Sequence, residues 1–178
     1  EIPNAYGAWW YSCIPVSAIE KNGFPMPFFI RCDDVEFGMR NQPTYMTMNA
    51  ICVWHASFEG RFRASVDCYQ YTRNFLAMIA VDDCTSEDWA IMRAKRDIRF
   101  NLRDYDYSAA EFILDGIEDY LKGPEYLEHL DGSALMMANG KRNEKLVPVE
   151  ELDQDLLREA GVTDEVLQSD QIAPGPVR

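Results

Sequence analysis

The stretch that most constrains the fold is residues 27–41, PFFIRCDDVEFGMRN. An apolar run at residues 28–30 precedes two adjacent carboxylates, Asp33 and Asp34, and a helix-compatible stretch follows them. This order predicts a strand, an acidic turn and a helix. In open α/β sheets ligands bind at the carboxyl ends of strands, so the two aspartates are candidate site residues.

A purely structural interpretation of the same residues stands beside the functional one. Asp33 followed by Glu36 is a capping pair, in which the aspartate accepts from the first helical N–H groups and Glu36 adds negative charge at the positive end of the helix dipole. Such caps are common, and on these residues alone capping is favoured over catalysis by about two to one. Asp34 is more than a cap requires, and adjacent carboxylates raise each other's pKa, which a catalytic base can use.

The net charge of −13 is unevenly distributed. Residues 1–80 carry 6 basic and 7 acidic side chains, whereas residues 81–178 carry 11 and 23. An acidic surface repels phosphate backbones, so no nucleic-acid partner is expected. The five cysteines lack zinc-finger spacing and lie in mostly apolar surroundings, which predicts buried free thiols in a reducing compartment.

Strand-type composition is confined to the first third of the chain. It occurs at residues 5–14, 45–48 and 50–54. His55 follows the last of these pieces, and a lone histidine at a strand end is more often a hydrogen-bonded structural residue than a metal ligand. Helical patterns dominate afterwards, and the expected helices are residues 17–22, 61–81, 86–102, 108–122, 124–130 and 149–160.

Three motifs together indicate a family. Trp9-Trp10, the DDVEFGMR run at 33–40 and Val53-Trp54-His55 closely resemble, in order and spacing, the polymerising galactofuranosyltransferase-like members of the inverting family 2 glycosyltransferases. That family has a GT-A fold. The resemblance is specific over residues 1–80 and weaker in the helices that follow.

The resemblance implies a role for each matching residue. Asp34 matches the general base that deprotonates the acceptor hydroxyl, and Asp33 and Glu36 match acids that bind acceptor hydroxyls. Trp9 and Trp10 match an aromatic wall for the acceptor sugar, and His55 matches a ligand of a divalent metal, Mn²⁺ or Mg²⁺. At lower weight, Tyr71 and Arg73 fall near the expected donor phosphates, although the family often has a histidine where Tyr71 stands.

The chemistry agrees with these roles. Inverting transfer needs one base opposite the departing nucleotide diphosphate, and a divalent metal helps that group to leave. Aromatic faces suit sugars because the C–H faces of sugars are apolar. With the spacing included, catalysis is favoured over capping at Asp34.

The expected architecture is therefore mixed α/β. Residues 1–82 would form the acceptor-side half of a GT-A domain, 83–163 a helical domain and 164–178 a flexible tail. The donor half, with its DxD metal motif, is not found before Trp9, and the chain starts without Met. A fragment that is inactive alone is therefore expected, from a cytoplasmic enzyme at the inner membrane face.

The expected partners are a nucleotide-diphosphate sugar donor and a carbohydrate or lipid-linked glycan acceptor, with homo-oligomerisation also considered. A rhamnosyl- or other hexosyltransferase is the alternative within the same class. Outside it, the alternative is a non-catalytic carbohydrate-binding or oligomerisation module. A glycosidase is disfavoured, because its two carboxyl groups must flank the scissile bond about 5–9 Å apart.

Overall fold

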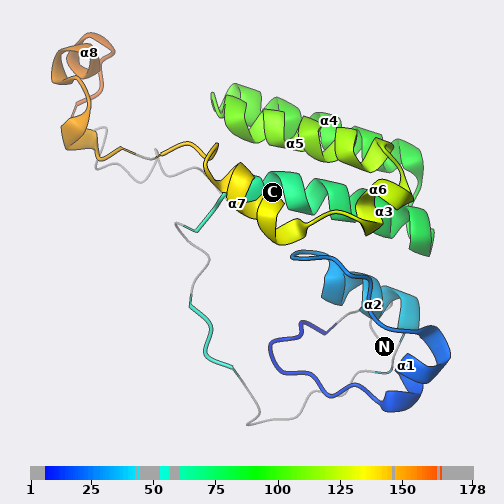
Figure 1. The fold of residues 1–178 in the computed structure, drawn as a ribbon. Helices are drawn as coiled ribbons and strands as arrows, with labels where there is room; N and C mark the ends of the chain where they lie inside the picture. The colour runs from blue at the N-terminus through cyan, green and yellow to red at the C-terminus, as the bar shows by residue number, and fades with distance from the viewer. Residues whose placement is uncertain are drawn as a thin grey trace. The chain divides into compact units, whose positions relative to one another are not determined.

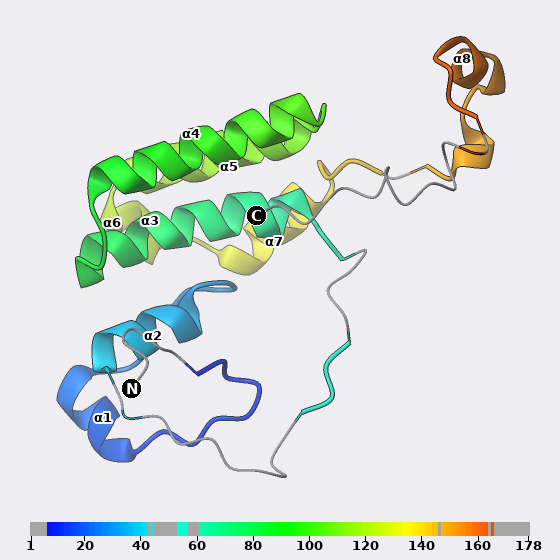
Figure 2. The same ribbon diagram turned by 180° about the vertical axis from the view of Figure 1, so that it is seen from behind.

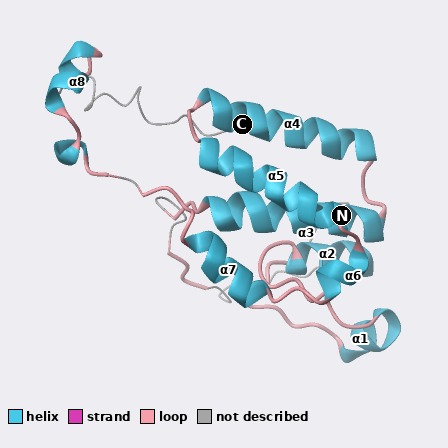
Figure 3. Ribbon diagram, turned by 45° about the horizontal axis from the view of Figure 1, so that its top comes forward, coloured by secondary structure: helices cyan, strands magenta, loops and turns pink. Residues whose placement is uncertain are grey.

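The computed structural model describes residues 7–42, 44, 53–56, 61–145, 147–163 and 165. Over these residues all regular secondary structure is helical (Figure 3). The elements are α1 (Val16–Asn22), α2 (Asp33–Asn41), η1 (Ser65–Gln70), α3 (Tyr71–Asp82), α4 (Glu87–Arg103), α5 (Tyr107–Leu121), α6 (Pro124–Glu128), α7 (Gly132–Gly140), η2 (Val149–Glu151) and α8 (Gln154–Glu159). The chain divides into two compact units, residues 1–143 and 144–178.

The predicted mixed α/β fold is wrong for the part of the chain that the structure describes. Residues 28–30 lie in a bent loop between Pro27 and α2 instead of forming a strand. A strand needs a neighbouring strand to satisfy its backbone polar groups, and here the amide of Asn74 binds the carbonyl of Ile30 instead. Residues 7–14 form loops and turns, while residues 45–52 lie outside the described part.

The helices predicted at residues 86–102, 108–122 and 124–130 are confirmed as α4, α5 and α6. Ser86 caps α4 by accepting from Trp89 N at 3.2 Å, and Pro124 occupies the first turn of α6. Asp106 caps α5 by accepting from Ala109 N at 2.8 Å. The helix expected over residues 61–81 is present as the π-helix η1 followed directly by α3.

Helix α5 lies at the centre of the first unit and contacts η1, α3, α4 and α6. Figures 1 and 2 show α4 and α5 side by side from opposite directions. In α5, Ala109, Ala110, Phe112 and Ile113 are buried because they recur on one helical face. The core consists of Ala64, Cys68, Tyr69, Ala109, Phe112 and Ile113, with Ile98, Ile117 and Leu135 packed against it.

Gly116 lets α5 approach the η1–α3 junction closely. A Cβ atom at this position would lie 2.8 Å from Tyr69 O and 3.3 Å from Arg73 N, both of which are backbone atoms. Backbone on two packed helices cannot move aside cheaply, so the close approach requires glycine here.

We expect Gly116→Ala to lower the free energy of unfolding by roughly 1–3 kcal/mol, because the added methyl group overpacks the α3–α5 contact. Urea unfolding followed by circular dichroism measures this. The matched control is Gly140→Ala in α7, where an added Cβ meets nothing within 4 Å. Equal stability of the two variants would contradict the close approach.

In the second unit, the single helix expected over residues 149–160 is divided. Asp153 has an extended backbone, and its carboxylate accepts from Asp155 N at 2.9 Å and Leu156 N at 3.2 Å. An aspartate that caps the following helix in this way ends the preceding one. The result is the short 3₁₀ helix η2 followed by α8.

Candidate functional site

Helix α2 presents the two adjacent carboxylates in its first turn. Cys32 occupies the position before the helix, and Asp33 and Asp34 are the first two helical residues, both partly exposed. Asp33 is therefore not the capping residue itself. The N-terminus of the helix stabilises negative charge on both side chains through the helix dipole.

The environment of Asp34 perturbs its titration. Burial and the neighbouring charge of Asp33 raise the pKa of Asp34, and these effects outweigh the opposing backbone N–H groups of Val35, Asp34 and Trp9. The bond from Val35 N to Asp34 Oδ1 measures 2.9 Å. A carboxylate with a raised pKa is a stronger base near neutral pH, as general-base catalysis requires.

The two neighbouring tryptophans lie against this helix and against the histidine. The Trp9 ring meets the Phe37 ring edge-on at 5.8 Å between centroids, and Trp9 also supplies the backbone N–H near Asp34. The Trp10 ring stacks on the His55 imidazole at 4.4 Å with an interplanar angle of 15°. We call Trp9, Trp10, Asp34, Phe37 and His55 the acceptor cluster, after the role that the sequence motifs predict.

The acceptor cluster joins residues that are widely separated in sequence. Trp9 and Trp10 come from the segment before α1, Asp34 and Phe37 from α2, and His55 from the segment after it. Trp10 remains 55% exposed, and His55 is exposed, so aromatic surface is accessible at the residue that follows Trp9. Sugar sites combine these features, an apolar platform and nearby carboxylates.

Glu36 is placed differently from Asp33 and Asp34. Its side chain is fully buried and forms an ion pair with Arg40 one helical turn later. Arg40 also donates to the carbonyls of Asn22 and Phe24, so the pair fastens α1 and its connector to α2. The Glu36 carboxylate therefore faces the interior and does not face the acceptor cluster.

The described residues do not assemble a complete metal site. They contain no group of three or more His, Cys, Asp or Glu side chains placed to hold a metal ion. His55 Nδ1 lies 2.6 Å from the carbonyl of Ala56. A divalent cation usually takes at least three protein or substrate ligands, so this part of the chain provides too few for Mn²⁺ or Mg²⁺.

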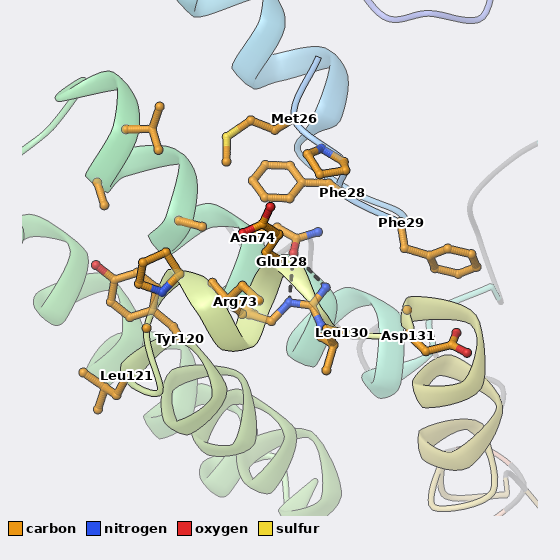
Figure 4. Close-up of a pocket in the computed structure, with 18 of the residues that line it drawn as sticks. Met26, Phe28, Phe29, Arg73, Asn74, Tyr120, Leu121, Glu128, Leu130 and Asp131 are labelled. Carbon is orange, nitrogen blue, oxygen red and sulfur yellow. Dashed lines mark hydrogen bonds between the residues drawn. The ribbon is translucent and has the colours of Figure 1, made fainter. Parts of the chain in front are cut away.

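The two candidates for donor phosphates face different surroundings. The Tyr71 ring stacks on Phe75 at 5.6 Å and lies under the Arg93 guanidinium at 5.3 Å, and burial raises the pKa of Tyr71. Arg73 is 5% exposed and lines a mainly apolar cavity of about 930 Å³. Figure 4 shows Arg73 and Asn74 at the wall of this cavity. The structure does not bring Tyr71 and Arg73 into one pocket.

Two further features of the site region were missed by sequence reasoning. Asn74 binds the backbone just before Asp33, and Tyr69 is hydrogen-bonded to Asp119 in the interior. A signal for both was available. Four polar side chains recur at helical spacing on the apolar face of the predicted helix: Tyr69, Gln70, Arg73 and Asn74. Polar groups on a buried face need hydrogen-bond partners, so this pattern indicates a buried polar network.

Cysteine placement agrees in part with expectation. Cys13, Cys32, Cys68 and Cys84 are free thiols. Cys32 and Cys68 are buried, and burial raises the pKa of each to about 12. Cys13 and Cys84 are exposed, and Cys52 lies outside the described residues.

Comparison with known proteins points to one group of enzymes. The chain is 28% identical over 138 residues to galactofuranosyltransferase GlfT2 of Mycobacterium tuberculosis, covering 73% of this chain and 22% of the relative. It is 30% identical over 135 residues to galactofuranosyltransferase GlfT2 of Mycolicibacterium smegmatis, covering 73% and 21%. The chain thus spans about a fifth of the length of these curated relatives.

No protein-family model matches the chain, and no solved structure is significantly similar to it. The similarity to the two curated proteins supports a glycosyltransferase-like relationship over roughly three quarters of the chain. In the part of the chain that the structure describes, none of the helices is both long and apolar enough to span a membrane.

Proposed function

We propose that this chain is the acceptor-binding part of a galactofuranosyltransferase that transfers the sugar with inversion, as the family 2 enzymes do, during synthesis of a cell-surface polysaccharide. The observation that carries the proposal is the acceptor cluster, in which Trp9 reaches Asp34 and Trp10 stacks on His55. The similarity to the two mycobacterial galactofuranosyltransferases supports the choice of reaction.

The proposed mechanism uses Asp34 as a general base. The acceptor sugar stacks on the exposed Trp10 ring, which directs one hydroxyl to the Asp34 carboxylate. Asp34 takes the hydroxyl proton while the oxygen bonds to the anomeric carbon of the donor and the bond to the nucleotide diphosphate breaks. Attack opposite the leaving group inverts the anomeric configuration. Asp33 keeps the Asp34 pKa raised and can accept a second acceptor hydroxyl.

The proposed reaction also involves a donor site and a metal site. The donor site and the other ligands of a divalent metal, Mn²⁺ or Mg²⁺, are proposed to come from the rest of the parent protein, with His55 as one ligand. No step above depends on that metal. The proposed place of action is the cytoplasmic face of the inner membrane, where a lipid-linked glycan would serve as acceptor.

A transfer assay with the full-length parent protein tests the proposal. We expect a nucleotide-diphosphate galactofuranose and an oligosaccharide acceptor to give a product of inverted anomeric configuration, determined by NMR. Trp10→Ala should raise the acceptor KM about two- to tenfold at nearly unchanged kcat, because one stacking contact is worth about 0.5–1.5 kcal/mol.

The control for this substitution is Tyr107→Ala, which removes an aromatic side chain of similar exposure, 56% against 55% for Trp10, from the start of α5. It should leave the acceptor KM unchanged. Retention of configuration, or transfer of rhamnose in preference to galactofuranose, would contradict the proposed reaction. Acceptor binding without any transfer would favour the carbohydrate-binding module.

A further inference from the structure

The backbone immediately before the two aspartates has an unusual conformation. Arg31 and Cys32 have φ angles of 70° and 69°, in the left-handed region. That region is unfavourable for residues with a Cβ atom because the side chain approaches the following carbonyl oxygen. Two such residues in succession persist only where their surroundings hold them. We call residues 31–34 the acid turn.

The side chain of Asn74, on α3, holds the acid turn in place. Its Nδ2 donates to Ile30 O at 2.8 Å and to Arg31 O at 3.0 Å. Asn74 is 1% exposed, so these bonds form away from competing water. The Arg31 side chain adds a second attachment through its ion pair with Asp67 on η1.

Asn74 is itself fixed by a buried network. Its Oδ1 accepts from Arg73 Nε at 3.0 Å and from Arg73 Nη2 at 2.9 Å, and Figure 4 draws these bonds. Arg73 Nη1 donates to the Tyr69 hydroxyl at 3.1 Å, and that hydroxyl donates to Asp119. Because the guanidinium requires an acceptor, the amide oxygen faces Arg73 and the Nδ2 donor must face the two carbonyls.

We propose that Asn74 is a positioning residue, which holds the acid turn in its left-handed conformation and thereby sets the direction in which Asp34 meets the acceptor hydroxyl. The inference rests on the proposed function of Asp34. The proposed role of Asn74 is indirect. It acts through the carbonyls of Ile30 and Arg31, at the two residues before Cys32.

The test substitution is Asn74→Asp in the full-length protein. The carboxylate keeps an acceptor for Arg73 and is nearly isosteric, but it removes the only donor to the two carbonyls that this side chain has. The control is Asn101→Asp on α4, where the amide Nδ2 donates to the Asp97 carbonyl at 2.9 Å. Both variants exchange one amide donor for a carboxylate, and only one of them touches the acid turn.

Hydrogen exchange measured by mass spectrometry reports on the turn without reference to activity. We expect peptides covering residues 31–37 to exchange roughly tenfold or more faster in the Asn74→Asp protein than in the wild type, because two buried hydrogen bonds are lost. The Asn101→Asp protein should leave these peptides unchanged. Unchanged exchange in both variants would overturn the proposal.

The pH profile of kcat/KM then separates positioning from general loss of folded enzyme. Charged groups around the turn are Asp33, Arg31 and Arg93, with Asp67 paired to Arg31. Burial is the main cause of the raised Asp34 pKa, so a loosened turn should move the acid limb to lower pH. The new carboxylate at position 74 would act in the opposite direction, but its charge is offset by the Arg73 guanidinium, which already bonds Oδ1 of Asn74. If the substitution only reduced the fraction of folded enzyme, kcat/KM would fall at every pH and the acid limb would stay at the same pH. That result would overturn the positioning role.

Failure of this proposal and failure of the proposed function give different results. If Asp34→Asn retains full transfer, Asp34 is not the base and the proposed function fails. If Asp34→Asn abolishes transfer while Asn74→Asp changes neither the exchange of residues 31–37 nor the acid limb, the function stands and the positioning role of Asn74 fails.

Discussion

Asp34→Asn in the full-length protein is expected to lower kcat for sugar transfer by roughly 10²–10⁴-fold, the range for loss of a general base. The amide keeps the size of the side chain but cannot take the proton of the acceptor hydroxyl. Acceptor KM should change little, because stacking on Trp10 does not depend on the charge of Asp34. Initial rates at saturating donor over a range of acceptor concentrations measure both quantities.

The matched control is Asp33→Asn, which removes the same charge one residue earlier. Asp33 raises the pKa of Asp34, so its loss should lower that pKa and move the acid limb of kcat/KM to lower pH. Transfer at neutral pH should remain within about tenfold of the wild type, since the side chain that takes the proton is unchanged. Equal losses in the two variants would contradict a distinct role for Asp34.

The two substitutions also decide between an enzyme and a binding module. A module that only binds carbohydrate would keep its affinity in the Asp34→Asn protein and would show no dependence on which aspartate is changed. The proposed function predicts the opposite, because turnover requires the base at Asp34 and not the neighbouring carboxylate of Asp33.

The sequence predicts the helices of this protein more accurately than it predicts the conformation of the N-terminal segment. The periodic apolar positions of α4 and α5, with Ser86 and Pro124 at helix starts, predict elements close to those observed. Residues 28–30 have the composition of a strand, but composition does not supply a partner strand. The carbonyl of Ile30 instead accepts a hydrogen bond from the side chain of Asn74, which lies 44 residues later in the chain.

In the candidate site too, local sequence patterns identify residues but do not show which distant residues they contact. Sequence motifs identified Trp9, Trp10, Asp34 and His55 as candidates, and in the structure Trp9 lies near Asp34 while Trp10 stacks on His55. The motifs do not distinguish Glu36 from Asp33 and Asp34, although only the Glu36 side chain of these three is buried and paired with Arg40. Asp34 and Glu36 differ because two helical steps of about 100° place their side chains on nearly opposite sides of α2.

Tyr69→Phe is the substitution with the largest expected effect on stability. The Tyr69 hydroxyl is shared between Asp119, to which it donates, and Arg73, from which it accepts, and the residue is 1% exposed. We expect the free energy of unfolding to fall by about 3–4 kcal/mol, because hydrogen bonds to charged groups contribute about 1.5–3 kcal/mol each and both partners stay buried. Urea unfolding at pH 7 measures the change.

The pH dependence of this loss follows from Asp119. Burial would raise the pKa of Asp119, but bonds from Lys122 and Tyr69 outweigh it and lower the pKa below its ordinary value. A lowered carboxyl pKa contributes stability that is present above about pH 4 and is lost as pH falls through the native value. The difference in free energy of unfolding between the wild type and Tyr69→Phe should therefore be largest at neutral pH and become smaller in acid. Tyr107→Phe at the exposed start of α5 is the control, and a gap that widened in acid would contradict the bond to an ionised Asp119.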